Sequence, residues 1–205
     1  MNSKNWSEIL RRLEKLIGRR KSELVYESPF QFAVSVLLSA QATDKSVNAA
    51  TPALFEAAPT PEAMLALGEA GVAGYVKHIG LWRAKSKNII GLSEMLLKDF
   101  GGKMPETRED IMKLPGLGRK SANVIMNELF GAPFIAVDTH VIRLAGRLGL
   151  TKSKDPVEIE RVLEKLTPRE YKPLVSNLLV LFGRYHCKAL KPDCSDCPIK
   201  EWCTV

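Results

Sequence analysis

Apolar residues return every three or four positions along almost the whole chain, which is the spacing of one face of an α-helix. The first such stripe comprises Trp6, Ile9, Leu10, Leu13, Leu16 and Ile17. No segment alternates apolar and polar residues as a half-buried strand does. We therefore predict an all-α fold of about ten helices joined by short loops, with helix ends placed to within a few residues.

Predicted helix starts carry a capping side chain that is followed by proline, or by an acidic residue three positions later. These signals occur at Thr60-Pro61, Asp155-Pro156, Thr167-Pro168 and Thr107. Glycines that follow periodic runs predict helix ends at Gly101, Gly131 and Gly149. Because no Pro- or Ser-rich linker divides the chain, we expect a compact pair of helical lobes joined near Pro133.

The composition is typical of a globular protein. Its 205 residues are 45% apolar and 26% charged, which excludes wholesale disorder and leaves enough apolar surface for a core. No run reaches about 18 unbroken apolar residues, and the first residues contain no apolar stretch typical of a secretion signal. We therefore expect a cytoplasmic protein that does not enter a membrane.

Lysine and arginine outnumber acidic residues by 30 to 23, and a net charge of +7 favours a polyanionic partner. Three stretches contain several basic residues and no acidic one. They carry Lys77, Arg83, Lys85 and Lys87; Lys113, Arg119 and Lys120; and Arg143, Arg147, Lys152 and Lys154. These stretches would form a phosphate-facing surface if the fold brings them together. The alternative is that each is simply a solvated helix face.

All four cysteines lie in the last nineteen residues, as Cys187, Cys194, Cys197 and Cys203. Such crowding indicates a shared ligand. Disulfides are disfavoured because nothing marks the chain as secreted, whereas four thiolates can fold a short tail around a metal centre. Spacing alone leaves zinc and an iron–sulfur cluster open, since both accept four cysteine ligands.

A glycine-rich turn, Leu114-Pro-Gly-Leu-Gly-Arg-Lys120, lies between a helix capped by Thr107 and a helix that runs to Phe130. Gly116 and Gly118 would allow positive φ angles and a close approach to a ligand. The second helix would then offer unpaired N–H groups and a positive dipole end to a phosphate. A simple turn is the alternative, but the flanking helices and Arg119 favour phosphate binding.

Lys120 is predicted in the first turn of the second helix, where the dipole disfavours a cation. That field, with partial burial, would favour a neutral amine able to attack carbon. A phosphate-contacting lysine is an equally good interpretation. Asp138 is predicted to be a helix N-cap, and a carboxylate fixed there could also stabilise positive charge or assist proton transfer. His140, one turn further, is expected to pack or to contact substrate, because no second histidine lies at ligand spacing.

Taken in order, these motifs resemble those of the helix-hairpin-helix DNA glycosylases, and within them the bacterial endonuclease III family. The resemblance rests on Leu114–Lys120, on Val137-Asp-Thr-His140 and on the C-x6-C-x2-C-x5-C tail. It also includes Leu38-Ser-Ala-Gln-Ala-Thr-Asp44 and Ile79-Gly-Leu81, so it covers essentially the whole chain. The chain departs from the family's usual pattern at Trp82 and Arg83, next to Leu81.

The resemblance implies two helical lobes with duplex DNA crossing the cleft between them. Residues 23–133 would form a six-helix lobe that carries the hairpin. Residues 1–22 and 134–205 would form a lobe that holds a [4Fe–4S] cluster on the four cysteines, which would decide between zinc and iron. The partner would be double-stranded DNA that contains damaged bases or abasic sites, bound by a monomer.

The same resemblance implies residue roles in base excision repair. Lys120 would be the nucleophile at C1′ of an oxidised pyrimidine nucleotide flipped out of the duplex, and Asp138 would assist it. A Schiff base would then permit β-elimination, which cleaves the strand 3′ to the abasic site. Gln41 would fill the emptied stack and Leu81 would be the opposing wedge. Backbone amides of Gly116 and Gly118 would hold phosphate, and Arg119 and His140 would also contact DNA.

Two other functions fit part of the pattern. One is a monofunctional adenine glycosylase of the same superfamily, which Lys120 argues against. The other is a non-catalytic, metal-stabilised DNA-binding module in which Lys120 only contacts phosphate.

Overall fold

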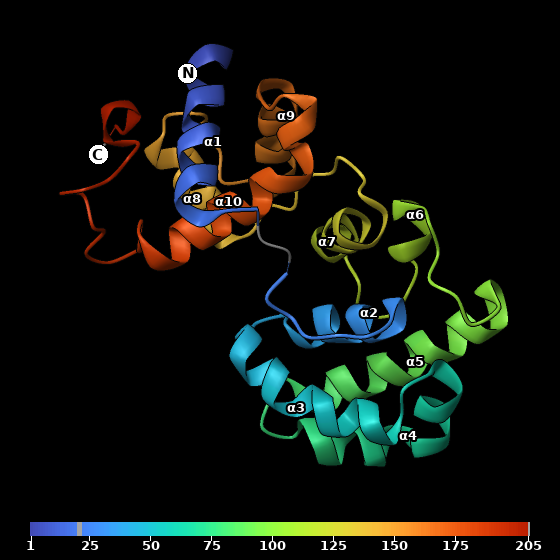
Figure 1. The fold of residues 1–205 in the computed structure, drawn as a ribbon. Helices are drawn as coiled ribbons and strands as arrows, with labels where there is room; N and C mark the ends of the chain where they lie inside the picture. Colours follow the sequence, from blue (N-terminus) through green and yellow to red (C-terminus); the bar gives the residue numbers. More distant parts are fainter. Residues whose placement is uncertain (20–21, 205) are drawn as a thin grey trace. The chain divides into compact units, whose positions relative to one another are not determined.

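The computed structural model describes residues 1–19 and 22–204, and within them every regular element is helical. The ten α-helices and two 3-10 turns are shown in Figure 1. In chain order they are α1 Ser3–Ile17, α2 Pro29–Leu38, α3 Asp44–Ala57, α4 Pro61–Val76, α5 Trp82–Phe100, α6 Arg108–Ile111, α7 Arg119–Phe130, α8 Thr139–Arg147, α9 Pro156–Leu166, η1 Arg169–Tyr171, α10 Lys172–Tyr185 and η2 Lys200–Trp202. The all-α prediction is confirmed.

The chain forms two compact units. The first, here called the hairpin unit, is Ser22–Phe130 and contains α2 to α7. The second, here called the terminal unit, joins Met1–Lys21 to Gly131–Val205 and contains α1 and α8 to η2. Each unit has its own apolar core.

Helix α2 is the central element of the hairpin unit. Its sequence from Phe30 to Leu38 is apolar apart from Gln31 and Ser35, and every residue of it is buried. Ser28 caps the helix by accepting the N–H of Gln31, and Pro29 occupies the first turn. A helix that is apolar on all sides must be covered on all sides, and α2 packs against α3, α5 and α7.

Helix α1 contributes its predicted stripe to the core of the terminal unit. Trp6, Ile9, Leu10 and Leu13 are fully buried and pack with apolar residues of α8, α9 and α10. Leu16, at the end of the stripe, is 45% exposed. The stripe therefore predicts the buried face correctly except in its last turn.

Most of the predicted helix starts and ends are confirmed. Thr60, Thr107 and Asp155 are N-caps whose side chains accept backbone N–H groups. The glycines at the predicted helix ends, Gly101, Gly131 and Gly149, all have positive φ.

The predicted start at Thr167 is wrong. Its backbone N–H donates to Leu163 O, so Thr167 closes α9 instead of opening a helix. Its hydroxyl accepts the indole N–H of Trp6 at 3.0 Å. Helical structure resumes two residues later as the 3-10 turn η1, with no side-chain cap, and α10 begins at Lys172. No helix in the described part of the chain is both long and apolar enough to span a bilayer.

Candidate functional site

The glycine-rich segment forms a tight turn between α6 and α7. Thr107 caps α6 by accepting the N–H of Asp110 at 3.2 Å. The N–H of Leu117 donates to Leu114 O at 3.1 Å, which closes the turn. Leu114 and Leu117 are almost completely buried, so two apolar anchors hold the turn against the hairpin unit, as the sequence predicts.

The two glycines of the turn have different roles. Gly116 has a φ of 82°, and a Cβ there would lie 2.8 Å from Leu37 Cδ1 and 3.0 Å from Asn88. Only glycine fits this position. The positive φ predicted for Gly118 is wrong, and a Cβ there would face open space. Gly118 directly precedes α7 and its carbonyl accepts the N–H of Ala122, so it lies at the helix start, where ordinary φ is usual.

Lys120 is the second residue of α7, as predicted, and its side chain is exposed. The expected partial burial is wrong. The buried face of α7 comprises Ala122, Asn123, Ile125 and Met126, and the helical period places Lys120 away from that face. The structure therefore presents the amine to solvent at the start of the second hairpin helix.

The far end of α7 is fixed by Glu128. The Tyr26 hydroxyl donates to Glu128 Oε1 at 2.9 Å, and the Ser22 N–H donates to Oε2 at 3.2 Å. Burial, the hydrogen bond to Glu128 and its negative charge raise the pKa of Tyr26 to about 12. These contacts join the start of the hairpin unit to its last helix, which carries Lys120. The sequence pattern gave no signal for this pairing.

Gln41 and Leu81 both lie in loops of the hairpin unit and both have left-handed backbones. Their φ angles are 53° and 62°, which is uncommon for residues with a side chain. Both side chains are exposed, and Leu81 is 59% exposed although it is a large apolar residue. Strained backbone of this kind is typical of functional loops.

Asp138 is the N-cap of α8, as predicted. Its Oδ1 accepts the N–H groups of His140 at 2.8 Å and Val141 at 2.9 Å. Both bonds end on the same carboxylate oxygen, so capping makes no use of Oδ2. Asp138 is half-buried, and Val137 before it is anchored in the core of the terminal unit. The carboxylate is thus held in one orientation.

His140 and Arg143 lie on the first turns of α8. Arg143 Nη2 is 3.1 Å from His140 Nδ1 and donates to Gly183 O at 2.8 Å. A Cβ on Gly183 would lie 2.9 Å from His140 Cβ, so α10 approaches α8 closely at this point. His140 is therefore packed and hydrogen-bonded, which agrees with one of its two predicted roles.

The four cysteines lie in the loops that follow α10, and none is disulfide-bonded. Burial raises the pKa of the Cys197 thiol, and like-charge repulsion from Cys187, Cys194 and Cys203 raises it further. No group of three or more His, Cys, Asp or Glu side chains in residues 1–19 and 22–204 is gathered at the spacing of a metal site.

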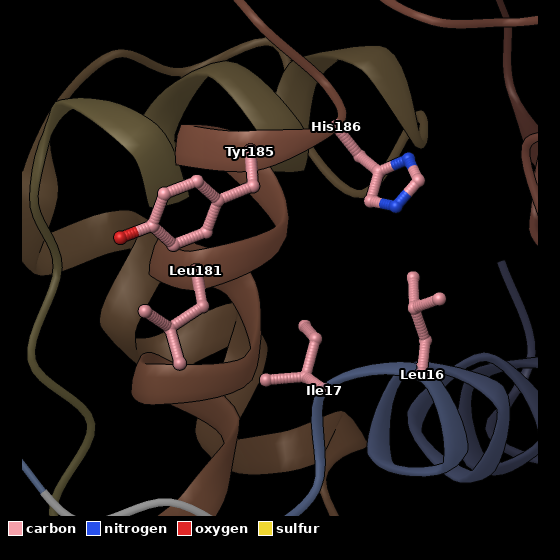
Figure 2. A pocket seen from close by; sticks show the side chains of 5 residues that line it. All are labelled: Leu16, Ile17, Leu181, Tyr185 and His186. Carbon is pink, nitrogen blue, oxygen red and sulfur yellow. The ribbon is translucent and has the colours of Figure 1, made fainter.

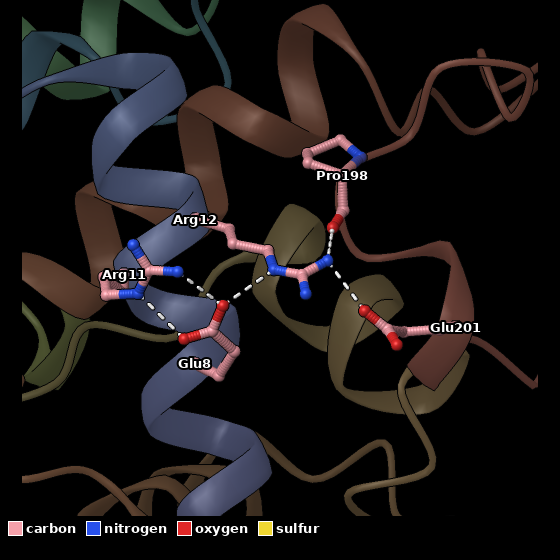
Figure 3. Close-up of polar contacts among 5 residues, drawn as sticks. All are labelled: Glu8, Arg11, Arg12, Pro198 and Glu201. Carbon is pink, nitrogen blue, oxygen red and sulfur yellow. Dashed lines mark hydrogen bonds and ion pairs between the residues drawn. The ribbon is translucent and has the colours of Figure 1, made fainter.

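Arginines of the terminal unit hold this tail in place. Arg147 Nη1 lies 3.0 Å from Cys187 Sγ and donates to Lys188 O at 2.8 Å. Arg12 of α1 donates to Pro198 O at 2.9 Å and pairs with Glu201 at 2.7 Å, as Figure 3 shows. Pro198 and Glu201 belong to the segment between Cys197 and Cys203. The tail is thus attached to α8 and α1 at both ends of the cysteine segment.

Comparison with known proteins identifies the family. Residues 34–169 match the HhH-GPD superfamily base excision DNA repair protein family. The chain belongs to this family. It is 49% identical to endonuclease III of Rickettsia conorii over 183 residues, which are 89% of this chain and 87% of that protein. It is 46% identical to endonuclease III of Escherichia coli over 203 residues, covering 99% of this chain and 96% of that protein.

Two solved structures share the fold of this chain. A trapped endonuclease III–DNA covalent intermediate matches with a TM-score of 0.95 and 39% identity, over 100% of this chain and 96% of that one. A thermostable thymine-DNA glycosylase matches with a TM-score of 0.88 at 21% identity, which supports the shared fold. The resemblance seen in the sequence is confirmed.

The basic stretches of this HhH-GPD protein contribute less to a phosphate-facing surface than the sequence predicts. Lys77, Arg83 and Lys87 are exposed, but Lys85 of the same stretch is buried. In the third stretch, Arg143 and Arg147 donate to carbonyls of residues 183–189. Their guanidinium groups are used inside the terminal unit, so charge counting overestimates the free cations there.

A pocket of about 170 Å³ in the terminal unit contains none of the predicted site residues. Figure 2 shows its lining by Leu16, Ile17, Leu181, Tyr185 and His186. These side chains come from the end of α1 and the end of α10 and are mostly apolar. Among the residues that the structure describes, its lining contains neither lysine nor arginine, the side chains that most often pair with phosphate.

Proposed function

We propose that this protein removes oxidised pyrimidines from duplex DNA and then cleaves the strand at the resulting abasic site. The observation that carries the proposal is an exposed lysine, Lys120, in the first turn of the second hairpin helix of an HhH-GPD protein. The match to a trapped endonuclease III–DNA covalent intermediate supports a covalent route. A nucleophilic lysine splits one difficult step into two easier ones.

In the proposed reaction, the Lys120 Nζ lone pair forms a bond to C1′, and the bond from C1′ to the base breaks. The base leaves with that electron pair and takes up a proton, and the amine Nζ, now bonded to C1′, loses one of its two protons. The C1′–O4′ bond then breaks, O4′ takes up a proton, and the opened sugar is a protonated Schiff base, an iminium that keeps the remaining Nζ proton. The iminium withdraws electrons from C2′, so a C2′ proton is lost and the C3′–O bond breaks. Water then hydrolyses the imine and frees Lys120.

Asp138 has the proposed role of carboxylate partner. A fixed, half-buried carboxylate can stabilise positive charge that develops on the sugar and can move a proton to or from the amine. Support comes from the N-cap, which uses only Oδ1 and leaves Oδ2 available. Because Lys120 and Asp138 belong to different units, the proposal requires both units to engage the same damaged nucleotide.

Proposed DNA contacts come from both loops and helix starts. Gln41 and Leu81 would insert into the base stack of the duplex. Their side chains are exposed and their backbones are left-handed, which suits this role. The N–H groups of Gly116 and Gly118 and the side chain of Arg119 would hold phosphate at the start of α7. His140 would contact DNA from α8.

The four tail cysteines are proposed to hold a [4Fe–4S] cluster within the terminal unit, and the hairpin unit corresponds to the second lobe. The donor set supports this ligand choice, because four free thiols lie within one short tail and an arginine N–H points at Cys187 Sγ. When bound, such a cluster would cross-link the tail through its four cysteines. We also propose that the protein is a monomer, and that it acts in the cytoplasm, the compartment that holds the DNA in bacteria such as those of its relatives.

The decisive test is borohydride reduction in the presence of a duplex that contains an abasic site. Wild-type protein is expected to form a covalent complex, and Lys120→Ala and Lys120→Arg are expected to form none. Lys120→Arg is the matched control, because it keeps a cation for phosphate binding but removes the nucleophilic amine.

Other outcomes favour the other functions. Binding without trapping by wild type would indicate the non-catalytic DNA-binding module. Excision of adenine without strand cleavage would indicate the monofunctional adenine glycosylase. Product analysis on duplexes that each carry one defined oxidised pyrimidine identifies the preferred lesion.

A further inference from the structure

Lys85 is a buried lysine in a stretch whose other basic residues are exposed. Its side chain is 4% exposed, and burial lowers its pKa. Its Nζ donates a 2.9 Å hydrogen bond to the carbonyl oxygen of Leu38. Since burying an amine is unfavourable unless it is hydrogen-bonded, this bond is a built feature of the hairpin unit.

The acceptor lies at the end of α2. Leu38 is the last residue of that helix, and the last carbonyls of a helix have no partner within it. The bond satisfies one of them and places an amine at the negative end of the helix dipole. Gln41 follows three residues later, in the loop that leads to α3.

The donor lies one turn into α5. The backbone N–H of Lys85 donates to Leu81 O at 3.0 Å, so Lys85 and Leu81 share the first turn of that helix. The loop before α5 also approaches the loop after α2, since a Cβ on Gly80 would lie 3.9 Å from the carbonyl oxygen of Gln41. The Lys85–Leu38 bond therefore connects the bases of the two loops that carry Gln41 and Leu81.

We propose that Lys85 is a positioning residue that fixes the Gln41 loop against the Leu81 loop, so that both side chains enter the duplex together when a nucleotide is extruded. This inference rests on the proposed function of the protein. Extrusion requires a few kcal/mol, and two wedge residues supply it only when their supports are rigid. Lys85 itself touches neither DNA nor the reacting atoms.

The consequence is a difference between two substrates. Excision of a base that is still paired depends on the full cost of extrusion, whereas an abasic site has no base pair to break. Loss of the Lys85 bond is therefore expected to slow excision of a paired lesion more than β-elimination at a preformed abasic site. A general loss of folded protein lowers both rates by the same factor.

The test uses Lys85→Met in the cluster-containing, full-length protein, because methionine nearly matches the length and volume of lysine but has no donor. Lys98→Met is the matched control, since it removes the same charge from an exposed position on the same helix, outside the basic stretches. We expect Lys85→Met to lower single-turnover excision about tenfold or more and abasic-site cleavage by less than about threefold. Lys98→Met is expected to leave the ratio of the two rates unchanged.

A double-mutant cycle with Leu81→Ala tests whether Lys85 acts through the wedge. If it does, the double variant excises less than about threefold more slowly than Leu81→Ala alone, because the side chain that Lys85 positions is already missing. Additive losses, or equal losses of both rates, overturn the proposal. If Lys85→Met does not fold, Lys85→Gln, whose side chain is one atom shorter, is expected to give the same change in ratio.

Failure of this inference is distinguishable from failure of the proposed function. Borohydride trapping of the wild type tests the function without involving Lys85. If wild type is trapped and excises lesions while Lys85→Met keeps the wild-type ratio, only the positioning role is wrong.

Discussion

Arg147 Nη1 of α8 lies 3.0 Å from the Sγ of Cys187, and the same guanidinium donates to the carbonyls of Lys188 and Ala189. One side chain thus fixes both the first cysteine and the direction of the chain beyond it. Hydrogen bonds from a charged donor each contribute about 1.5–3 kcal/mol. The order of the cysteine tail therefore depends on a residue outside it.

Replacing Arg147 by methionine is expected to loosen the proposed cluster without unfolding the terminal unit, because α8 keeps its buried face. We expect iron release to a chelator to become about tenfold faster, which corresponds to about 1.4 kcal/mol. Arg161→Met, at an exposed position of α9, is the control and should leave the release rate unchanged. Equal release rates for both variants and wild type would show that the Arg147 contacts do not hold the metal centre.

Glu8 makes the terminal unit sensitive to acid. Hydrogen bonds from Arg11 and Arg12 lower the pKa of Glu8 from 4.5 to about 2. Because the folded pKa lies below the unfolded one, this contribution to stability is present above pH 4.5 and is lost as the pH falls from 4.5 towards 2. Protonation of Glu8 also weakens one of the contacts that orient Arg12, which holds Pro198 and Glu201.

Glu8→Gln is therefore expected to lower the melting temperature at pH 6 and to flatten its dependence on pH below 4.5. Thermal unfolding followed by circular dichroism across this range measures both effects. Glu158→Gln, which removes an exposed carboxylate of α9, is the control. An unchanged acid slope in Glu8→Gln contradicts the prediction.

The two hairpin glycines should respond differently to alanine. Gly116→Ala introduces a Cβ at positive φ and within 2.8 Å of Leu37 Cδ1, so we expect a loss of about 2–4 kcal/mol in unfolding free energy. Gly118→Ala meets open space and should lose at most about 1 kcal/mol, as expected at a helix start. Urea denaturation of both variants checks the difference, and equal losses would falsify the assignment of strain to Gly116.

Asp138→Asn separates capping from catalysis. Asparagine caps helices about as well as aspartate, so folding is expected to be retained. Base excision is expected to fall by about a hundredfold or more, since the carboxylate charge is gone. Asp155→Asn makes the same change at the N-cap of α9 and should keep full activity. Unfolding of Asp138→Asn, with activity lost only for that reason, would leave capping as its main role.

The local parts of this fold could be predicted from sequence because their causes are local. Caps such as Thr60 and Thr107, helix ends such as Gly101, and the buried face of α1 depend on residues within one or two turns. The same holds for Asp138, whose capping geometry spans three residues. The hairpin was predictable for this reason, with the exception of the backbone angle at Gly118.

Other features depend on residues distant in sequence and could not be predicted. Thr167 carries a good capping signal, but Trp6 takes its hydroxyl from across the terminal unit. Lys85 has the pattern of a surface cation, and only the end of α2 explains its burial. Arg143 and Arg147 add to the net positive charge that suggests DNA binding. Their guanidinium N–H groups, however, donate to backbone carbonyls of the tail.

The terminal unit is assembled from both ends of the chain, and this has a consequence for biosynthesis. Residues 22–130 form a continuous segment that can fold as soon as it has left the ribosome. Helix α1 is synthesised before its partners α8 and α10, so Trp6 and its neighbours stay unburied until those helices have been made. Loading of the proposed cluster would therefore follow the synthesis of the tail and its docking on α1 and α8.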